Sequence, residues 1–328
     1  MDKKSRIIRT IGRTILYIIL IAGALMALVP FFWMISTSLM TLGETINRQM
    51  LPDIPQFVNY QEAWGEANFS RYFQNSVVIT SITLAGMMTT SVLAGYAFAR
   101  IKFPGRNIIF AILLATMMIP ESITVLPNQL LIRGLIIPLP GVDQRAFDSC
   151  MRTGLEGLTA IGMESDFFSN LSLKLSCQFS NLAMGVSWIN TLQALTLPFM
   201  ASAFSIFLLR QFFAQIPNEL WDAARIDGSG HLRFLWQIVL PISKAPMMTV
   251  LLFGFIGSWN AFMWPLLVTT KDVKRPIMVG LWTFVQEAGP QTHLLMAGAV
   301  ITLIPILIIY FITQKQFTEG IATTGLKG

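Results

Sequence analysis

Six long apolar blocks dominate the pattern of hydrophobic and polar positions along the chain. Each block has about twenty residues and almost no charge, a length that matches the hydrocarbon thickness of a bilayer. The apolar positions are continuous and do not alternate, and in lipid only helices and closed barrels satisfy every backbone polar group. The pattern therefore predicts an all-α polytopic membrane protein with six transmembrane helices. We place these helices at Thr14–Ser36, Asn75–Ala99, Ile108–Leu126, Leu192–Phe213, Pro246–Val268 and Leu294–Thr313.

The composition agrees with a membrane protein. Of the 328 residues, 54% are hydrophobic and 12% are charged, whereas soluble domains have about 25% charged residues. The formal net charge is +6, but the basic residues lie at the ends of the apolar blocks. This position favours a role in membrane topology and contact with lipid, and we expect no nucleic-acid partner.

The first apolar block follows a basic segment, as a cleaved signal peptide also would. Its apolar run is much longer than the core of a typical signal peptide, and it ends in Phe31, Phe32 and Trp33, which are not the small residues of a cleavage site. We therefore expect an uncleaved first span.

Lysine and arginine are denser in segments 1–13, 100–106, 210–244 and 315–328 than in the remaining loops. The positive-inside rule then places both termini in the cytoplasm. The resulting division has five parts: a cytoplasmic N-terminus (1–13), helices 1–3 with the outer loop 37–74 (14–136), an extracytoplasmic insertion (137–188), helices 4–6 with the cytoplasmic loop 214–245 (189–313), and a cytoplasmic tail (314–328).

The two cysteines, Cys150 and Cys177, both fall in the predicted insertion. Outside the cytoplasm a disulfide is feasible, and closing this loop would contribute about 3 kcal/mol in the chain-entropy model. Two unpaired thiols are the alternative. The cysteines and histidines lack metal-ligand spacing, so we expect no metal site. The chain also lacks a phosphate-binding loop and a catalytic constellation, so we expect no ATP site and no enzyme.

The longest predicted cytoplasmic loop has the pattern of a helix, a turn and a second helix. Pro217 and Asn218 are typical of a helix start, and Gly228 is typical of the position that follows a helix end. The first helix has about ten residues and is marginal alone in water, so it needs a surface to pack on. The pattern alone favours an ordinary amphipathic helix that lies on the membrane surface.

Within this loop, Asp222, Ala223 and Ala224 are followed by Gly228, Ile238, Leu240 and Pro241. This string resembles the EAA loop of binding-protein-dependent ABC importer permeases at every spacing, except that Asp222 stands where the family usually has Glu. Further similarities to the carbohydrate-uptake branch, of the maltose-type second permease, cover most of the chain outside 137–188. They lie at Asn75–Val77, Ala94–Arg100, Phe103–Gly105, Ala201–Phe213, Trp259–Pro265 and Gln314–Gly328.

The resemblance implies a type I ABC importer permease fold and a transmembrane permease subunit of an ATP-driven importer, for a sugar or sugar derivative. The implied partners are a second permease, two ATP-binding subunits that hold ATP-Mg, and an extracytoplasmic solute-binding protein. The cytoplasmic loop would be the coupling element that contacts the ATPase. The residues implied in that contact are Glu219, Asp222, Ala223, Ala224, Asp227, Gly228, Ile238, Leu240 and Pro241. The tail 314–328 would also touch the ATPase, with a disordered terminus as the alternative.

Polar and aromatic residues inside the predicted spans are candidates for lining a transport path. Glu121 is an ionisable residue near a span end, and Asn260 lies among Trp259 and Phe262. Ionisable groups within membrane spans are functional candidates by default. A water-exposed position for Glu121, and helix packing through one hydrogen bond for Asn260, are equally consistent with the sequence.

A self-contained secondary transporter is the main rival interpretation. It would need internal repeats and broken helices with coupling charges near the bilayer midplane, and the sequence has no clear repeat. A membrane scaffold without transport is less consistent with the EAA-type loop.

Overall fold

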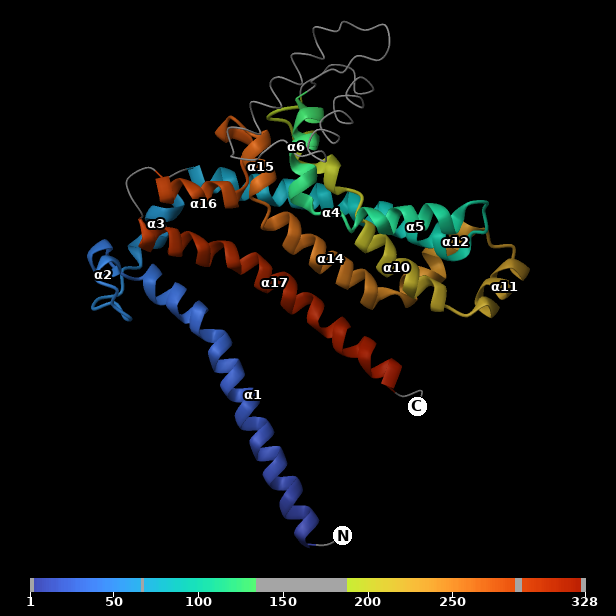
Figure 1. Cartoon of the computed structure of the whole chain (residues 1–328), viewed down its shortest axis with the longest axis horizontal. Helices are drawn as coiled ribbons and strands as arrows, with labels where there is room; N and C mark the ends of the chain where they lie inside the picture. The colour runs from blue at the N-terminus through green and yellow to red at the C-terminus, as the bar shows by residue number, and fades with distance from the viewer. Residues whose placement is uncertain (1–2, 66–67, 134–187, 287–290, 326–328) are drawn as a thin grey trace, which may run out of the picture. The chain divides into compact units, whose positions relative to one another are not determined.

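The structure is a computed structural model that describes residues 3–65, 68–133, 188–286 and 291–325. All regular elements in these ranges are helices (Figure 1). Nearly all of the predicted insertion, with Cys150 and Cys177, lies outside the described residues. The chain divides into two compact units, residues 1–70 with 280–305 and residues 71–279 with 306–328.

Unit one begins with α1 (Lys3–Ser38), which contains the first predicted span. Between Ile15 and Ile35 nearly all of its large apolar side chains are exposed, as the surface of a helix in lipid requires. The unit continues with α2 (Leu42–Ile46) and α3 (Val58–Gly65). It also contains most of α16 (Ile277–Gln286) and the first part of α17 (Thr292–Gly325).

Side chains hold the loop after α1 in place. The buried Asn59 amide donates to the carbonyls of Ser38 (2.9 Å) and Met40 (2.8 Å), and the Tyr60 hydroxyl lies 2.7 Å from Ser38 Oγ. Thr41 and Glu44 form a capping box at the start of α2. Hydrogen bonds from the backbone N–H groups of Thr41 and Asp53 lower the pKa of the Glu44 carboxyl.

Unit two is organised around α4 (Phe69–Arg100), which begins in the last residues of unit one. It continues with α5 (Arg106–Thr116), α6 (Glu121–Ile132), α9 (Leu192–Thr196), the 3₁₀ turn η3 (Leu197–Phe199) and α10 (Ala203–Gln215). Beyond the cytoplasmic loop follow α14 (Lys244–Trp259), α15 (Met263–Val268) and η5 (Asp272–Lys274).

Three predicted spans are not single helices. The fourth span, placed at Leu192–Phe213, is divided into α9, η3 and α10. The third span, placed at Ile108–Leu126, is divided into α5 and α6, which meet at 99°. α5 ends at Thr116, and Pro120 keeps the helix from continuing because it lacks a backbone N–H and disfavours helical geometry at Ile119. The fifth span, placed at Pro246–Val268, breaks at Asn260 between α14 and α15.

By length and composition, four helices in the described part of the chain are able to cross a membrane, and the number rises to six if each bent pair is one span. The second bent pair joins residues 231–242 to α14 at 83°. The predicted number of six spans is therefore reached when both bent pairs are counted, although the second pair begins inside the predicted cytoplasmic loop 214–245.

The core of unit two lies where α4 meets α10. Leu209 and Phe213 of α10 are fully buried beside Tyr96. A Cβ atom placed on Gly95 would lie 3.1 Å from Leu209 Cβ and 3.3 Å from the Arg210 backbone nitrogen. The missing side chain thus lets the two backbones approach, which is how helices commonly pack in membranes.

Candidate coupling surface and cavity

The predicted EAA-type loop forms α11 (Asn218–Ile226), followed by α12 (His231–Phe234). Figure 1 shows α11 at the end of unit two, next to α10 and α12. The guanidinium of Arg100, the last residue of α4, fixes the start of α11. It donates to the carbonyl of Ile216 (2.7 Å) and the side chain of Asn218 (2.8 Å). The loop is therefore attached directly to the end of α4.

Aromatic contacts make a second attachment. The His231 ring stacks on Trp221 of α11, with centroids 4.3 Å apart and planes 13° apart. Its Nδ1 lies 2.9 Å from the Tyr96 hydroxyl of α4. Phe234 packs edge-on against Trp221 at 5.0 Å and is buried. His231 therefore contacts both the loop helix and α4.

The turn between α11 and α12 is a Schellman motif. Gly228 has φ +74°, its N–H donates to the Arg225 carbonyl (3.0 Å), and the N–H of Ser229 donates to the Ala224 carbonyl (2.8 Å). The left-handed conformation favours glycine because it lacks a Cβ. The prediction that Gly228 follows the helix end is confirmed.

The predicted coupling residues of α11 and its turn divide into two sets. Ala224 is 5% exposed and packs in the core with Phe213 and Phe234. The remaining residues of the set are exposed: Glu219, Asp222, Ala223, Asp227 and Gly228. One side of α11 thus anchors the helix, and the other presents carboxylates and a small residue.

Of the three predicted residues that follow α12, two pack inside the subunit and Pro241 is exposed. Ile238 and Leu240 pack against the same core, on a π-helical turn (η4, Leu235–Val239) and on α13 (Leu240–Ile242). Pro241 has no N–H to donate within the helix, and the chain bends by 83° into α14 two residues later.

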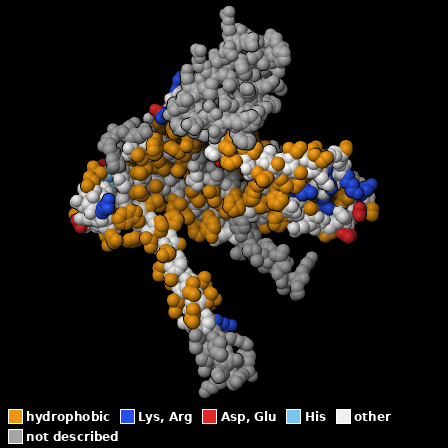
Figure 2. All heavy atoms as spheres, in the orientation of Figure 1, with side chains coloured by type: hydrophobic (Ala, Val, Ile, Leu, Met, Phe, Trp, Pro, Cys, Tyr) orange, Lys and Arg blue, Asp and Glu red, His pale blue; other side chains and the backbone are white. Residues whose placement is uncertain are grey.

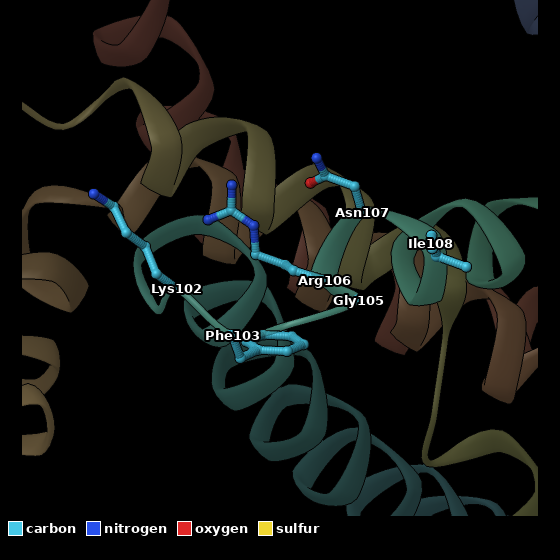
Figure 3. A pocket seen from close by; sticks show the side chains of 6 residues that line it. All are labelled: Lys102, Phe103, Gly105, Arg106, Asn107 and Ile108. Carbon is cyan, nitrogen blue, oxygen red and sulfur yellow. The ribbon is translucent and has the colours of Figure 1, made fainter.

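The turn between α4 and α5 carries basic side chains at the same end of unit two as α11. Figure 3 shows the side chains of Lys102 and Arg106 extending on the same side of the turn, where a hollow of about 320 Å³ lies. Phe103 packs on Phe98 with centroids 6.0 Å apart. Figure 2 shows Lys and Arg side chains gathered at this end of unit two.

Unit two also contains a cavity of about 810 Å³. One wall is a stripe of α4 that includes Thr83, and another is the first two turns of α6, from Glu121 to Asn128. Asn260 and Ser202, at two helix breaks, also line it. Breaks at membrane depth expose backbone polar groups, which are tolerated where they border a cavity.

Residues 87–322 match the family described as the binding-protein-dependent transport system inner membrane component. The chain belongs to this family. It is thus a permease subunit of an ABC importer in the inner membrane. Residues 87–322 include the coupling loop and the lining of the cavity other than Ser76, Ile79 and Thr83. Membership in this family also argues against a self-contained secondary transporter, because transport in the family depends on a binding protein.

Individual relatives agree over nearly the full length. The permease is 27% identical over 312 residues to the diacetylchitobiose uptake system permease protein NgcG of Streptomyces coelicolor, covering 93% of this chain and 85% of NgcG. It is 29% identical over 315 residues to the sn-glycerol-3-phosphate transport system permease protein UgpE of Yersinia pestis, covering 93% and 94%.

A solved structure supports the fold. A chain of a bacterial ABC transporter involved in import of the acidic polysaccharide alginate superposes with a TM-score of 0.65 at 20% identity. The superposition covers 97% of this permease and 99% of that chain. The ABC importer permease fold predicted from the sequence is confirmed.

Three of the four candidate path residues, Glu121, Asn260 and Phe262, line the cavity of the permease. Trp259 does not belong to the described lining. It is 1% exposed, and its ring stacks on Phe255 (5.5 Å) and meets Phe73 edge-on (5.6 Å). Trp259 therefore points into the packed interior and not into the cavity, although the next residue, Asn260, lines the cavity. Successive helix positions are about 100° apart around the helix axis.

Sequence reasoning missed other polar lining residues. Thr83 and Ser202 lie in apolar blocks, where a single hydroxyl changes the hydropathy little, and Asn128 lies just beyond the end of the third block. A helical stripe was the available signal: Ser76, Ile79, Thr83 and Met87 recur at the three- and four-residue spacing of one helix face.

Proposed function

We propose that this permease forms half of the translocation path for a sugar or sugar derivative. A second permease supplies the other half, a solute-binding protein delivers the cargo, and two ATPase subunits hydrolyse ATP. ATP-Mg binds to the ATPases, and this chain has no enzymatic activity of its own. The sugar assignment is supported by relatives such as NgcG, whose name gives diacetylchitobiose as its cargo.

The proposal rests on one observation: α11 packs on its own subunit with one side and is exposed on the other. Ala224 attaches the helix to its own subunit, while Asp222 and Ala223 face outward. A carboxylate on a short exposed helix can form charge-assisted hydrogen bonds with arginine on a docked subunit. Ala223 allows close approach because its side chain is small.

The orientation follows from the same surface. Arg100, Lys102 and Arg106 lie at the end of unit two that carries α11. Basic residues concentrate on the cytoplasmic side of a membrane. We therefore place α11 in the cytoplasm. With six spans along the chain, both termini then lie on the same side as α11, and the loop after α15 lies on the side of the solute-binding protein.

Co-purification tests this function. The tagged permease, co-expressed with its partners, is expected to retain the second permease and the ATPases, and Ala223→Arg is expected to lose the ATPases but keep the second permease. Gln61→Arg, an equally large change at an exposed position of α3, is the matched control. Solute uptake by the permease alone in liposomes, without ATPase subunits, would refute the proposal.

A further inference from the structure

The charge of the cavity lining points to the class of solute that it admits. Among the described residues that line it, Glu121 is the sole ionisable side chain. The other polar side chains are hydroxyls, amides and the indole of Trp264, whose N–H donates to the Ala194 carbonyl. We propose that the cavity admits uncharged, hydroxyl-rich solutes and rejects anions, and that Glu121 sets this selectivity. The inference rests on the proposed function, because it treats the cavity as part of the transport path.

Electrostatics gives the direction of the selectivity. A phosphate or carboxylate on a solute needs cations or several charge-assisted hydrogen bonds to replace its water. The described lining contains no lysine, arginine or histidine. A carboxylate within about 8 Å of an anion in a partly desolvated site disfavours it by about tenfold or more.

Thr83 supplies an independent sign of a polar ligand. Its side chain lines the cavity and is 4% exposed, yet its hydroxyl has no hydrogen-bond partner among the described residues. Helical threonines commonly donate to a carbonyl one turn back. A hydroxyl that can both donate and accept is matched by a hydroxyl of a sugar or polyol, which does the same.

Similarity alone does not choose between neutral and anionic solutes. UgpE is named for an anionic phosphoester and NgcG for a disaccharide, and the permease resembles both to nearly the same degree, 29% and 27%. Because the two similarities are nearly equal, the choice between a neutral and an anionic solute rests on the cavity lining.

The charge of the cavity can be measured without knowing the cargo. In the assembled complex, Cys150→Ser and Cys177→Ser remove the native thiols, and Thr124→Cys introduces one in the lining, one helical turn from Glu121. The labelling rates of 2-hydroxyethyl and 2-sulfonatoethyl methanethiosulfonate, which are neutral and anionic, are compared. Gln61→Cys, on exposed α3, is the control thiol.

We expect the neutral-to-anionic rate ratio at Thr124→Cys to exceed that at Gln61→Cys by about tenfold. Glu121→Gln should remove this excess at Thr124→Cys and leave the ratio at Gln61→Cys unchanged. Equal ratios at the two thiols, an excess that persists in Glu121→Gln, or failure of both reagents to label Thr124→Cys would each overturn the proposal.

The labelling result is separable from the proposed function. A complex that hydrolyses ATP but transports nothing would contradict the transport role while the charge measurement still stands. Conversely, the complex could take up glycerol 3-phosphate, driven by ATP, as fast as glycerol or a neutral disaccharide. That result would agree with the transport role and contradict the proposed selectivity.

Discussion

The Tyr96 hydroxyl lies 2.9 Å from Nδ1 of His231, and these two residues join the membrane-spanning α4 to the loop that carries α11. On α4, Tyr96 is thirteen residues from Thr83, which lines the cavity. At 1.5 Å per residue the two positions are about 20 Å apart on one continuous helix. A displacement of α11 therefore has a direct mechanical route to the cavity wall.

Weakening this contact should reduce the coupling of transport to ATP hydrolysis. Tyr96→Phe removes one hydrogen bond, worth about 0.5–1.5 kcal/mol, and His231→Ala also removes the stack on Trp221. We expect the number of solute molecules transported per ATP to fall severalfold in His231→Ala and less in Tyr96→Phe. Both rates are measured in liposomes that contain the full complex.

The double variant supplies the control for this prediction. If the contact acts as a unit, adding Tyr96→Phe to His231→Ala should cost little more than His231→Ala alone. Additive losses would show that the two residues act independently, and an unchanged transport-to-ATP ratio in His231→Ala would exclude the contact from coupling.

Arg100 makes the other connection, and its shape matters as well as its charge. Its two terminal nitrogens bond to Asn218 and Ile216 at once, which a single ammonium group on a shorter stem reproduces poorly. Arg100→Lys should therefore lower coupled transport severalfold while leaving assembly intact. Arg106→Lys is the matched control, because its longer contact with Ile101, at 3.4 Å, contributes less. Equal effects of the two substitutions would contradict this role.

The sequence predicted the helical membrane fold and the helix–turn–helix character of the coupling loop, because apolar length and turn glycines act locally. It did not predict that Ala224 anchors α11 while its neighbour Ala223 faces outward. That distinction depends on α10 and α12, which contact the loop only in the folded protein. The motif marks both alanines without separating their roles.

The break in the third span shows a different limit. Pro120 marks a helix end locally, but a bend of 99° between α5 and α6 depends on what the two halves pack against. Hydropathy averages over the break and joins the two helices into one span. The bend brings Glu121 to the start of α6 and onto the cavity wall. The position of this ionisable residue at the cavity therefore depends on tertiary packing, which the local sequence does not show.

Gly228 provides a test of the rigidity of the turn. At φ +74° a side chain with a Cβ costs about 1–2 kcal/mol. Gly228→Ala should therefore destabilise the turn, reduce coupled transport and leave insertion into the membrane unchanged. Gly228→Asn should be milder because asparagine tolerates the left-handed conformation better. Gly43→Ala, where nothing lies within 4 Å of the added Cβ, should behave as wild type. Transport is measured in liposomes, and a harmless Gly228→Ala would show that the turn tolerates strain.

Gly95 provides a test of the packing between α4 and α10. The space beside it is bordered by Leu209 and by the Arg210 backbone, so a larger side chain must push the two helices apart. Gly95→Leu should lower the stability of the purified complex by about 1–3 kcal/mol or more, as overpacking does, and lower its melting temperature in detergent. Gly23→Leu on exposed α1 has nothing within 4 Å and should leave the melting temperature unchanged. Leu209→Ala should partly restore the Gly95→Leu variant, because it removes the Leu209 atoms beyond Cβ and frees space for the outer atoms of the new side chain. If Leu209→Ala only added to the damage, the close approach of α4 and α10 at Gly95 would not be the cause of the loss.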